Sequence, residues 1–459
     1  MTTMGSSSRV KGAGTNPIMT RGGRASQSGS FSAMIRAMKN KKEIFGWAMF
    51  DFANSAYTTN IVTVIFANYF VQGIVQGEGG KTLWGVGITI SNILIIFSAP
   101  IIGAIGDFSS CRKKFLVVTC LLCVIGTAGL FFATPGAVAL AIVLFVVSNY
   151  FFQISESICS SFLPDLAEPK ELGKISGLGW SLGYVGGLVG LLLCFPLVGS
   201  DFGPENAWNL RLTNLVTAAT FLVAAIPTFV FLKEHRPGQI LPEGTSYIGM
   251  GFQRVRNTLT HLKQLRDLSV FLAVFLLMSV ALTTVFSFST IYSSEEMGFS
   301  VKDLMVLFIV VQISAAAGAF SFGYIQDRIG LRFSIQILLL VWSGILVGIF
   351  FTYSVQVFWV LVLLLGAGLG SIQSAARAMV GYLAPASKRA EIFGFWSLTY
   401  KMGGLVGPLM YGVIADNFSH RAAMLFISSF YILAFLLNLK VDEERGHEAG
   451  NEFERKYAL

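Results

Sequence analysis

Four ionisable side chains stand within long apolar stretches of this sequence: Asp51, Glu156, Arg377 and Lys401. A charged group is costly inside a lipid bilayer, so the ionisable residues found there usually face a partner or a water-filled cavity and mark a transport path. These four residues are therefore the first candidates for the chemistry of the protein. That chemistry would be the binding of charged groups rather than the making or breaking of bonds.

Glu156 and Arg377 occupy equivalent places in two similar halves of the chain, 221 positions apart, and Gln153 and Gln373 are 220 positions apart. A cavity that offers one carboxylate, one guanidinium and two amides suits a zwitterion, with Glu156 holding an ammonium group and Arg377 a carboxylate. In the alternative interpretation, Glu156 and Arg377 neutralise each other as an inner gate and do not touch the cargo. We therefore assign these four residues to substrate binding or to a gate.

Asp51 has no charged counterpart, because the equivalent position in the second half lies near Phe271. A carboxylate in a partly dry site gains affinity for protons, and Asp51 is our candidate for coupling transport to a proton gradient, with Lys401 beside it. Asp51 could instead be a permanent partner of Lys401, or could order the start of its helix together with Asn54. Asn54 and Tyr57 add polar groups along the same helix, where they could bind cargo or a sodium ion.

Two short phrases occur in both halves of the chain. GAIGDFSSCRKK (Gly103–Lys114) returns as GYIQDRIGLR (Gly323–Arg332), and WSLGYVGGLVG returns as WSLTYKMGGLVG. Each copy of the first phrase ends an apolar run at a short basic turn, where its aspartate can cap a following helix start and pair with nearby arginines. In the alternative, the cations only keep the turn on the cytoplasmic side. The candidates for a conformational latch are Asp107, Arg112, Asp327, Arg328 and Arg332.

The elements that must position these residues are membrane helices. The sequence has 459 residues, of which 54% are hydrophobic and 13% charged, whereas an ordinary soluble protein has about a quarter charged residues. Because a bilayer core takes roughly 20 apolar residues per helix, the pattern predicts an all-α membrane protein with twelve transmembrane helices in two pseudo-symmetric six-helix bundles. The predicted spans lie near residues 44–72, 83–106, 115–133, 138–163, 175–198, 208–232, 268–292, 303–326, 333–353, 356–383, 390–415 and 421–440.

The positive charges set the expected orientation. With the amino terminus inside, the cytoplasmic segments hold 27 of the 33 Lys and Arg residues, so the positive-inside rule places both termini in the cytoplasm. We expect short helices on the membrane surface around residues 31–42 and 248–265, unless these segments are solvated connectors. The expected organisation is a basic, mostly disordered tail (1–43), a first bundle (44–232), a cytoplasmic linker (233–267), a second bundle (268–440) and a tail (441–459).

Other classes of function find no support in the sequence. We see no catalytic triad, phosphate-binding loop or zinc-ligand spacing, so we expect neither an enzyme nor a bound cofactor or metal ion. Cys120 and Cys123 have CxxC spacing, but they fall in an apolar helix and no span contains a histidine. The net charge of +8 equals the eight cations of residues 1–42 and does not indicate nucleic-acid binding. We expect a monomer in membrane lipid whose partners are a small-molecule substrate and, through Asp51, protons.

Three motifs resemble those of known families. The repeated GxxxD phrase with its basic turn resembles the loop signature of the major facilitator superfamily, and the first copy departs from it at Ser110 and Cys111. GWAMFDFANSAY (Gly46–Tyr57) and AEIFGFWSLTYKMGGLVGPLMYG (Ala390–Gly412) resemble the vacuolar amino-acid effluxer family linked to autophagy and its bacterial relatives. The resemblance implies a rocker-switch transporter in which spans 1, 4, 7 and 10 line a central cavity, and it suggests amino acids as cargo.

We therefore expect a secondary active transporter that moves a small polar organic solute, first of all an amino acid, by alternating access, with proton coupling through Asp51. The alternative is a membrane receptor or sensor on a transporter scaffold. Other cargo, such as a peptide, sugar, nucleoside, siderophore or drug, is compatible with the same charges. A bacterial inner membrane is the favoured location, and an organellar membrane fits the Arg- and Ser-rich start of the chain.

Overall fold

A computed structural model describes residues 25–75, 79–199, 202–235, 241, 246–261 and 264–457. Residues 1–42 make up one unit, and residues 43–459 form a second, compact unit that contains all the candidate site residues. Every regular element in the described ranges is a helix. Residues 1–24 of the predicted disordered tail lie outside the described residues, and helix α1 (Ala25–Tyr57) starts within the rest of that tail. The tail is therefore helical from Ala25 onward.

The first bundle consists of six membrane-crossing segments. In the first of them, α1 continues as two π-helical stretches, η1 (Thr58–Val64) and η2 (Phe70–Ile74), on either side of the short α2 (Phe66–Tyr69). The other five are α3 (Gly80–Ser109), α4 (Arg112–Gly129), α5 (Val138–Ser160), α7 (Leu172–Val198) and α8 (Ala207–Phe231). Short helical turns flank them: η3 (Leu130–Phe132), α6 (Leu163–Leu166), η4 (Pro169–Glu171) and η5 (Pro204–Asn206).

The second bundle repeats this plan. Its crossing segments are α10 (Arg266–Glu295), α11 (Val301–Ile329), α12 (Leu331–Phe351), α13 (Val355–Leu383), α14 (Arg389–Asn417) and α15 (His420–Asn438). The turn η6 (Ala386–Lys388) precedes α14. Two helices lie outside the bundles, α9 (Tyr247–Thr260) in the linker and α16 (Glu443–Tyr457) after the last crossing.

Ten helices in the described residues are long and apolar enough to cross a membrane. The other two crossings are those of α1 and α14. The π-helical stretches interrupt the first one after Tyr57, and α14 contains Arg389, Glu391, Lys401 and Asp416, which lower its mean hydropathy. The prediction of twelve transmembrane helices in two sets of six is confirmed.

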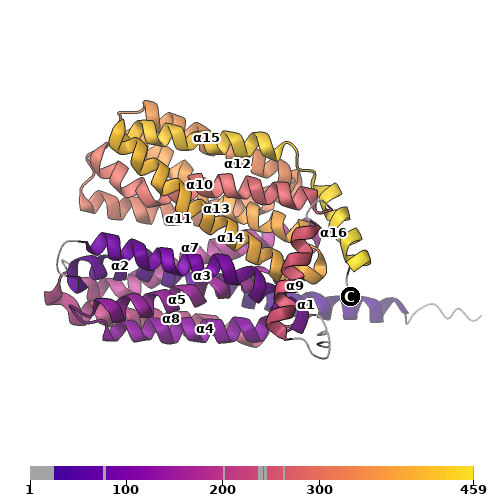
Figure 1. The fold of residues 1–459 in the computed structure, drawn as a ribbon. Coiled ribbons are helices and arrows are strands. Elements are labelled where there is room, and N and C mark those ends of the chain that lie inside the picture. The colour runs from indigo at the N-terminus through magenta and orange to yellow at the C-terminus, as the bar shows by residue number, and fades with distance from the viewer. Residues whose placement is uncertain are drawn as a thin grey trace, which may run out of the picture. The chain divides into compact units, whose positions relative to one another are not determined.

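The two bundles meet mainly along two helix pairs, α3 with α14 and α7 with α11 (Figure 1), and α13 also contacts α7. Both pairs approach most closely at glycine. A Cβ atom on Gly103 of α3 would lie 2.2 Å from the carbonyl oxygen of Ala390, and a Cβ atom on Gly177 of α7 would lie 2.4 Å from that of Ala319. Only residues without a side chain let two helix backbones come this close. The seam between the bundles is therefore tight at these two places.

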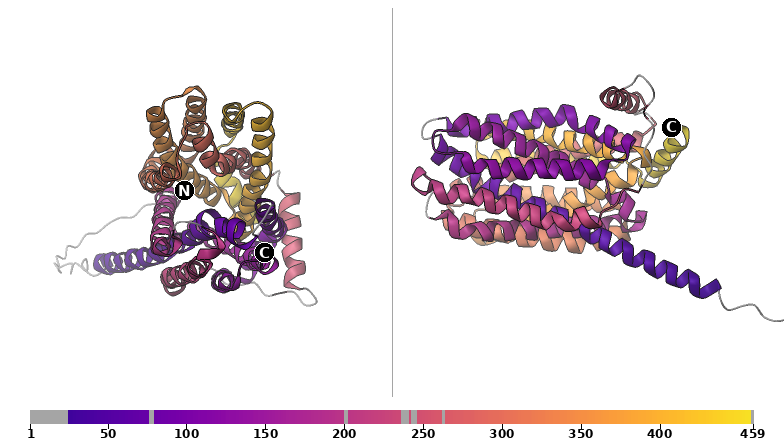
Figure 2. Two further views of the ribbon diagram at one scale, coloured as in Figure 1. Left: turned by 90° about the vertical axis from the view of Figure 1, so that its left-hand side faces the viewer. Right: turned by 90° about the horizontal axis from the view of Figure 1, so that it is seen from below.

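One end of the compact unit, where α3 and α11 end and α4, α12 and α14 begin, is rich in arginine and lysine, and we call it the basic end. The charge count predicts that it faces the cytoplasm. Helices α9 and α16 lie at this end, and α9 runs across the membrane helices rather than along them (Figures 1 and 2). The Ser246 side chain caps α9 by accepting a hydrogen bond from the backbone N–H of Gly249 at 3.0 Å.

Candidate functional site

A salt bridge between two membrane helices joins the two bundles. Asp51 lies on α1 and Arg377 on α13, and Arg377 Nη1 donates to Asp51 Oδ2 at 2.7 Å. Both side chains are almost completely buried, with exposed fractions of 10% for Asp51 and 2% for Arg377. Because breaking such a pair leaves an uncompensated buried charge, this contact holds α1 against α13.

Every nitrogen of the Arg377 guanidinium has a partner. Besides the bond to Asp51, Nε donates to the Ser176 hydroxyl at 3.1 Å and Nη2 donates to the Ser176 carbonyl oxygen at 2.9 Å. The ring centroids of Trp47 and Trp180 lie 4.7 and 5.3 Å from the guanidinium carbon, which adds cation–π attraction in a site away from water. In this conformation Arg377 is a structural part of the interface between the bundles.

Gly179 of α7 makes room for this salt bridge. A Cβ atom at this position would lie 2.4 Å from Asp51 Oδ2 and 2.6 Å from Arg377 Nη2. Any side chain here would push the carboxylate and the guanidinium apart or displace α7. The glycine at position 179 is thus a condition for the pairing of Asp51 with Arg377.

Glu156 and Lys401 form a second group of charges between the bundles. Glu156 lies on α5 and Lys401 on α14, and both side chains are half-buried. The positive charge of Lys401 attracts the Glu156 carboxylate. The Lys401 ammonium also lies 5.0 Å from the centroid of the Tyr400 ring. Lys401 thus has an attractive carboxylate and an aromatic face in its surroundings.

The structure corrects the pairing of charges expected from the sequence. We considered Glu156 as the partner of Arg377 and Lys401 as the partner of Asp51, but the guanidinium binds Asp51. The physical reason is the space above Gly179, which lets Arg377 reach across α7 to α1. Each group still contains one acid from the first bundle and one base from the second.

The two glutamines and Asn54 lie on the same helices as the charges. Gln373 on α13 accepts a hydrogen bond from the Tyr184 hydroxyl of α7 at 2.5 Å, which is another contact between the bundles. Gln153 lies on α5 one turn before Glu156 and is buried, as is Asn54 on α1. These amides supply hydrogen-bonding groups close in sequence to Glu156, Arg377 and Asp51.

Tyr57 lies inside the first bundle. Its side chain is fully buried, its hydroxyl forms a 2.9 Å hydrogen bond with that of Ser148, and its ring stacks on Phe152 with 4.9 Å between centroids. These contacts are all with α5 of the same bundle. In this conformation Tyr57 is a packing residue at the point where α1 becomes π-helical.

The first copy of the repeated phrase contacts the opposite bundle. Asp107, at the end of α3, accepts a hydrogen bond from the backbone N–H of Glu391 in the first turn of α14 at 3.0 Å. Arg112 Nε lies 4.0 Å from Asp107, but Arg112 also donates to Asp165 at 2.7 Å and to Glu234 at 3.1 Å. Asp165 in turn pairs with Arg389 of the second bundle. Asp107 and Asp165 therefore both cross the seam at the basic end.

The second copy makes the equivalent contact in the other direction. Asp327, at the end of α11, accepts hydrogen bonds from the backbone N–H groups of Gly173 and Lys174, both at 2.9 Å. These two residues form the first turn of α7 in the first bundle. A carboxylate at a helix N-terminus satisfies free N–H groups and is favoured by the helix dipole. Each aspartate thus caps a helix of the opposite bundle.

This arrangement corrects the expectation that each aspartate caps the helix that follows it. The starts of α4 and α12 are served by other carboxylates: Glu234 accepts from the backbone N–H of Lys113 at 3.1 Å, and Glu443 accepts from that of Arg332 at 2.9 Å. The Arg332 side chain donates to the carbonyl oxygen of Leu439, and Arg328 is exposed. Arg332 therefore bonds to the segment between α15 and α16 of its own bundle and does not cross the seam.

Several residues of these sites were missed because they carry no unusual signal in the sequence. Ser176 and Gly179 are small residues in an apolar helix, and only the arginine that they accommodate reveals their role. Glu234 and Glu443 did leave a signal, since each follows the last crossing of its bundle by a few residues. The repeat could have identified this pair of acids as equivalent.

Lys388 lies in the turn η6 that leads into α14 and is almost completely buried. Its ammonium donates to the Thr258 hydroxyl of α9 at 2.7 Å and to the Glu391 carboxylate at 3.1 Å. Burial lowers the pKa of Lys388, and the neighbouring Glu391 opposes this change. The linker helix is thereby tied to the same first turn of α14 that Asp107 caps.

Comparisons with known proteins agree with this architecture. The family model described as "Vacuole effluxer Atg22 like" matches residues 86–451. The uncharacterized MFS-type transporter YxiO of Bacillus subtilis (strain 168) is 24% identical over 409 residues, which cover 86% of this chain and 95% of that protein. Autophagy-related protein 22 of Coccidioides immitis (strain RS) is 24% identical over 446 residues, with 80% of this chain and 73% of that protein covered.

Solved structures of low sequence identity share the fold. FucP, a major facilitator superfamily transporter solved in the outward conformation, has a TM-score of 0.69 at 14% identity and covers 87% of this chain and 98% of its own. A bacterial homologue of the iron transporter ferroportin, in the outward-facing state, has a TM-score of 0.66 at 16% identity, with coverages of 88% and 98%. With the family model matching most of the sequence, the chain belongs to the vacuole effluxer Atg22-like family and is a multi-pass secondary transporter of the major facilitator type.

Proposed function

We propose that this transporter carries a small zwitterionic solute, first of all an amino acid, with Glu156 receiving the ammonium group and Lys401 the carboxylate. The observation that supports this assignment is the contrast between the two groups of charges. Arg377 is buried and engaged at every nitrogen, whereas Glu156 and Lys401 are half-buried. A guanidinium whose three nitrogens are already bonded to protein groups is poorly placed to receive a cargo carboxylate, so the role first considered for Arg377 passes to Lys401.

In this proposal the pair of Asp51 and Arg377 is the inner gate and the point of proton coupling. Protonation of Asp51 removes the negative charge that holds Arg377 and weakens the tie between α1 and α13. Proton binding then favours separation of the bundles, which alternating access requires. Release of Asp107 and Asp327 from the helix starts that they cap accompanies opening of the basic end.

The proposed orientation places the basic end and both chain termini in the cytoplasm. The membrane is either a bacterial inner membrane or, following the description of the family, a vacuolar membrane. In both cases we expect a single chain to be able to work by itself as a monomer, because each of the proposed roles is filled by its own residues.

The test is exchange of labelled solute across proteoliposomes that contain the purified protein. A neutral amino acid should exchange, while its amide (without the carboxylate) and its N-acetyl form (without the ammonium) should compete at least tenfold more weakly. Lys401→Gln should abolish the preference over the amide, and Glu156→Gln should abolish the preference over the N-acetyl form. Asp51→Asn should keep exchange and lose accumulation driven by a proton gradient.

Each outcome separates this proposal from its alternatives. Solute binding without flux would favour a receptor or sensor built on the transporter scaffold. Exchange that Glu156→Gln and Lys401→Gln leave equally selective would show that the zwitterion is not held by these charges. Unchanged proton-driven accumulation in Asp51→Asn would exclude Asp51 as the coupling residue.

A further inference from the structure

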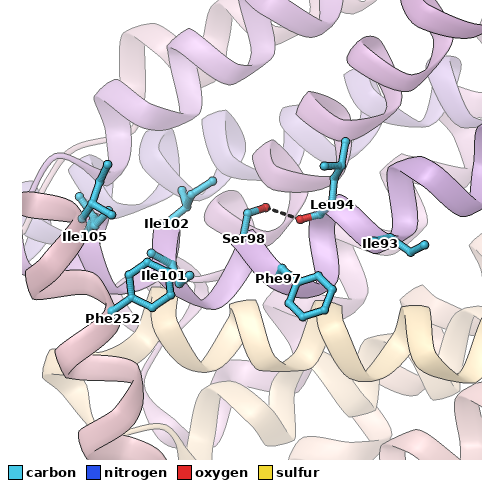
Figure 3. A pocket seen from close by; sticks show the side chains of 9 residues that line it. Ile93, Leu94, Phe97, Ser98, Ile101, Ile102, Ile105 and Phe252 are labelled. Atoms are coloured by element: carbon cyan, nitrogen blue, oxygen red, sulfur yellow. Dashed lines mark hydrogen bonds between the residues drawn. The ribbon is translucent and has the colours of Figure 1, made fainter.

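A groove of about 390 Å³ runs along α3 where the linker helix α9 crosses it (Figure 3). Its walls are apolar, with Ile93, Phe97 and Ile101 on α3 and Ile248 and Phe252 on α9. The lining residue Ser98 turns its hydroxyl to the Leu94 carbonyl oxygen at 2.7 Å and so offers little polarity to an occupant. Phe97 is 73% exposed, and Ile248 and Phe252 are more than half exposed. The groove therefore opens to the surroundings of the helices, which for a membrane crossing such as α3 are lipid.

Helix α9 has one face that packs on the protein and one face that is exposed. One face packs on the protein: Tyr247 meets the Phe108 ring of α3 edge-on at 6.5 Å, a Cβ atom on Gly251 would lie within 3.0 Å of Ile105 and Ile101, and Thr258 binds Lys388. The other face is exposed and contains Ile248, Phe252 and Arg256 at intervals of four residues. These three side chains follow one line along the helix, apolar at the groove and cationic one turn beyond it.

We propose that the groove binds an acyl chain of an anionic phospholipid from the leaflet at the basic end, with the lipid headgroup at Arg256. The geometry supports this occupant, because α3 crosses the bilayer while α9 lies across its end, as helices in the membrane interface do. The angle between them is open to hydrocarbon along Ile93 and Phe97 and to the headgroup layer beside Arg256. An exposed cation at this depth attracts anionic lipid.

Lipid in this groove acts on the latch as well. Helix α9 holds the turn before α14 through two bonds, from Arg254 to the Ser387 carbonyl oxygen at 3.0 Å and from Lys388 to Thr258. The first turn of α14 is the one that Asp107 of α3 caps. A lipid chain that fixes α9 on α3 therefore fixes the closed seam between α3 and α14, so anionic lipid favours the conformation in which the basic end is closed.

Native mass spectrometry of the delipidated full-length protein tests this site without any transport assay. The probes are phosphatidylglycerol and phosphatidylcholine with identical acyl chains. We expect one tightly held lipid per protein, with phosphatidylglycerol preferred. Arg256→Gln should reduce this preference about fivefold, which corresponds to about 1 kcal/mol, while Ile93→Trp, which fills the groove, should remove the bound lipid of both kinds.

Two variants serve as matched controls. Lys440→Gln removes an exposed cation at the same end of the second bundle, and Ile313→Trp enlarges an exposed residue of α11 that is the repeat equivalent of Ile93, 220 positions later. Both should retain the bound lipid and its preference. Equal retention of the two lipids by the unaltered protein, or equal losses in the control variants, would overturn the proposal. The unfolding temperatures of Arg256→Gln and Ile93→Trp should equal that of the unaltered protein, which shows that both variants fold. Phe252→Ala, which removes one wall of the groove, is a second test and should also weaken the bound lipid.

Discussion

At the scale of single residues, the position of Arg377 depends on groups from two helices of the first bundle, α1 and α7. Asp51 on α1 supplies the countercharge, Ser176 on α7 accepts two hydrogen bonds, and the rings of Trp47 and Trp180 cover the guanidinium. These contacts place a permanently charged group where lipid or an apolar core would be expected. A buried arginine is tolerated when a countercharge and hydrogen-bond acceptors surround it, as they do here.

The space at Gly179 gives the first prediction at this scale. Gly179→Ala should lower the free energy of unfolding by about 1–3 kcal/mol, because the added methyl group overlaps Asp51 and Arg377. The matched control is Gly412→Ala on α14, where no atom lies within 4 Å of an added Cβ; this change should stabilise the helix by up to about 1 kcal/mol. Reversible unfolding in detergent measures both. Equal effects of the two substitutions would refute the role of Gly179.

At the scale of helices, the two aspartates of the repeated phrase hold the seam by capping helix starts of the opposite bundle, next to the ion pair of Asp165 with Arg389. Asp327 binds two backbone N–H groups of α7, and Asp107 binds one of α14. Backbone groups keep their dipoles under all conditions, whereas a salt bridge between exposed side chains is weakened by salt. We therefore expect the two caps to depend little on ionic strength.

The second prediction concerns the first turn of α7. Asp327→Ala should accelerate hydrogen exchange at the backbone amides of Gly173 and Lys174, since the loss of a helix cap costs about 0.5–2 kcal/mol. Asp327→Asn should preserve most of the protection because asparagine also caps helices. Arg328→Ala is the control, and its exposed side chain predicts no change. Exchange rates that do not respond to Asp327→Ala would contradict the cap.

The helices could be predicted from the sequence more completely than the contacts between them. Apolar length and the repeated phrases gave the twelve crossings, and ionisable residues inside spans identified Asp51, Glu156, Arg377 and Lys401. The depth of each charge follows from its distance to the end of its span, at 1.5 Å per residue. The partner of each charge cannot be predicted in this way. It depends on how the helices are rotated about their axes and on which neighbouring residues are small enough to leave room. Gly179 decides the pairing of Arg377. Because glycine occurs in membrane helices for many reasons, its presence in the sequence does not reveal this role.

At the scale of the whole molecule, the contacts at the basic end act together. The close approaches at Gly103 and Gly177, the two caps and the bridge from Asp165 to Arg389 all lie across the seam at that end. The conformation is therefore closed at the basic end. Alternating access requires these contacts to be lost together, since the bundles move as units.

The third prediction follows from this cooperation. In a Cys111→Ser background, Ala390→Cys places a thiol in the closed seam, where Ala390 is 2% exposed. Breaking both caps with Asp107→Ala and Asp327→Ala should raise the rate of labelling by a water-soluble maleimide about 30-fold, if each cap contributes about 1 kcal/mol. Either substitution alone should raise it about fivefold. Labelling that stays slow in the double variant would show that the caps do not hold the seam.

The reciprocal caps also bear on how the polypeptide is assembled. The first turn of α7 obtains its acceptor from Asp327, and the first turn of α14 obtains its acceptor from Asp107. In the closed conformation each half takes one helix cap from the other, so a protein severed between α8 and α9 would give two fragments that each lack one of these caps. Because each fragment carries the aspartate that caps a helix of the other, we expect the two fragments to associate when they are made as separate polypeptides in the same membrane.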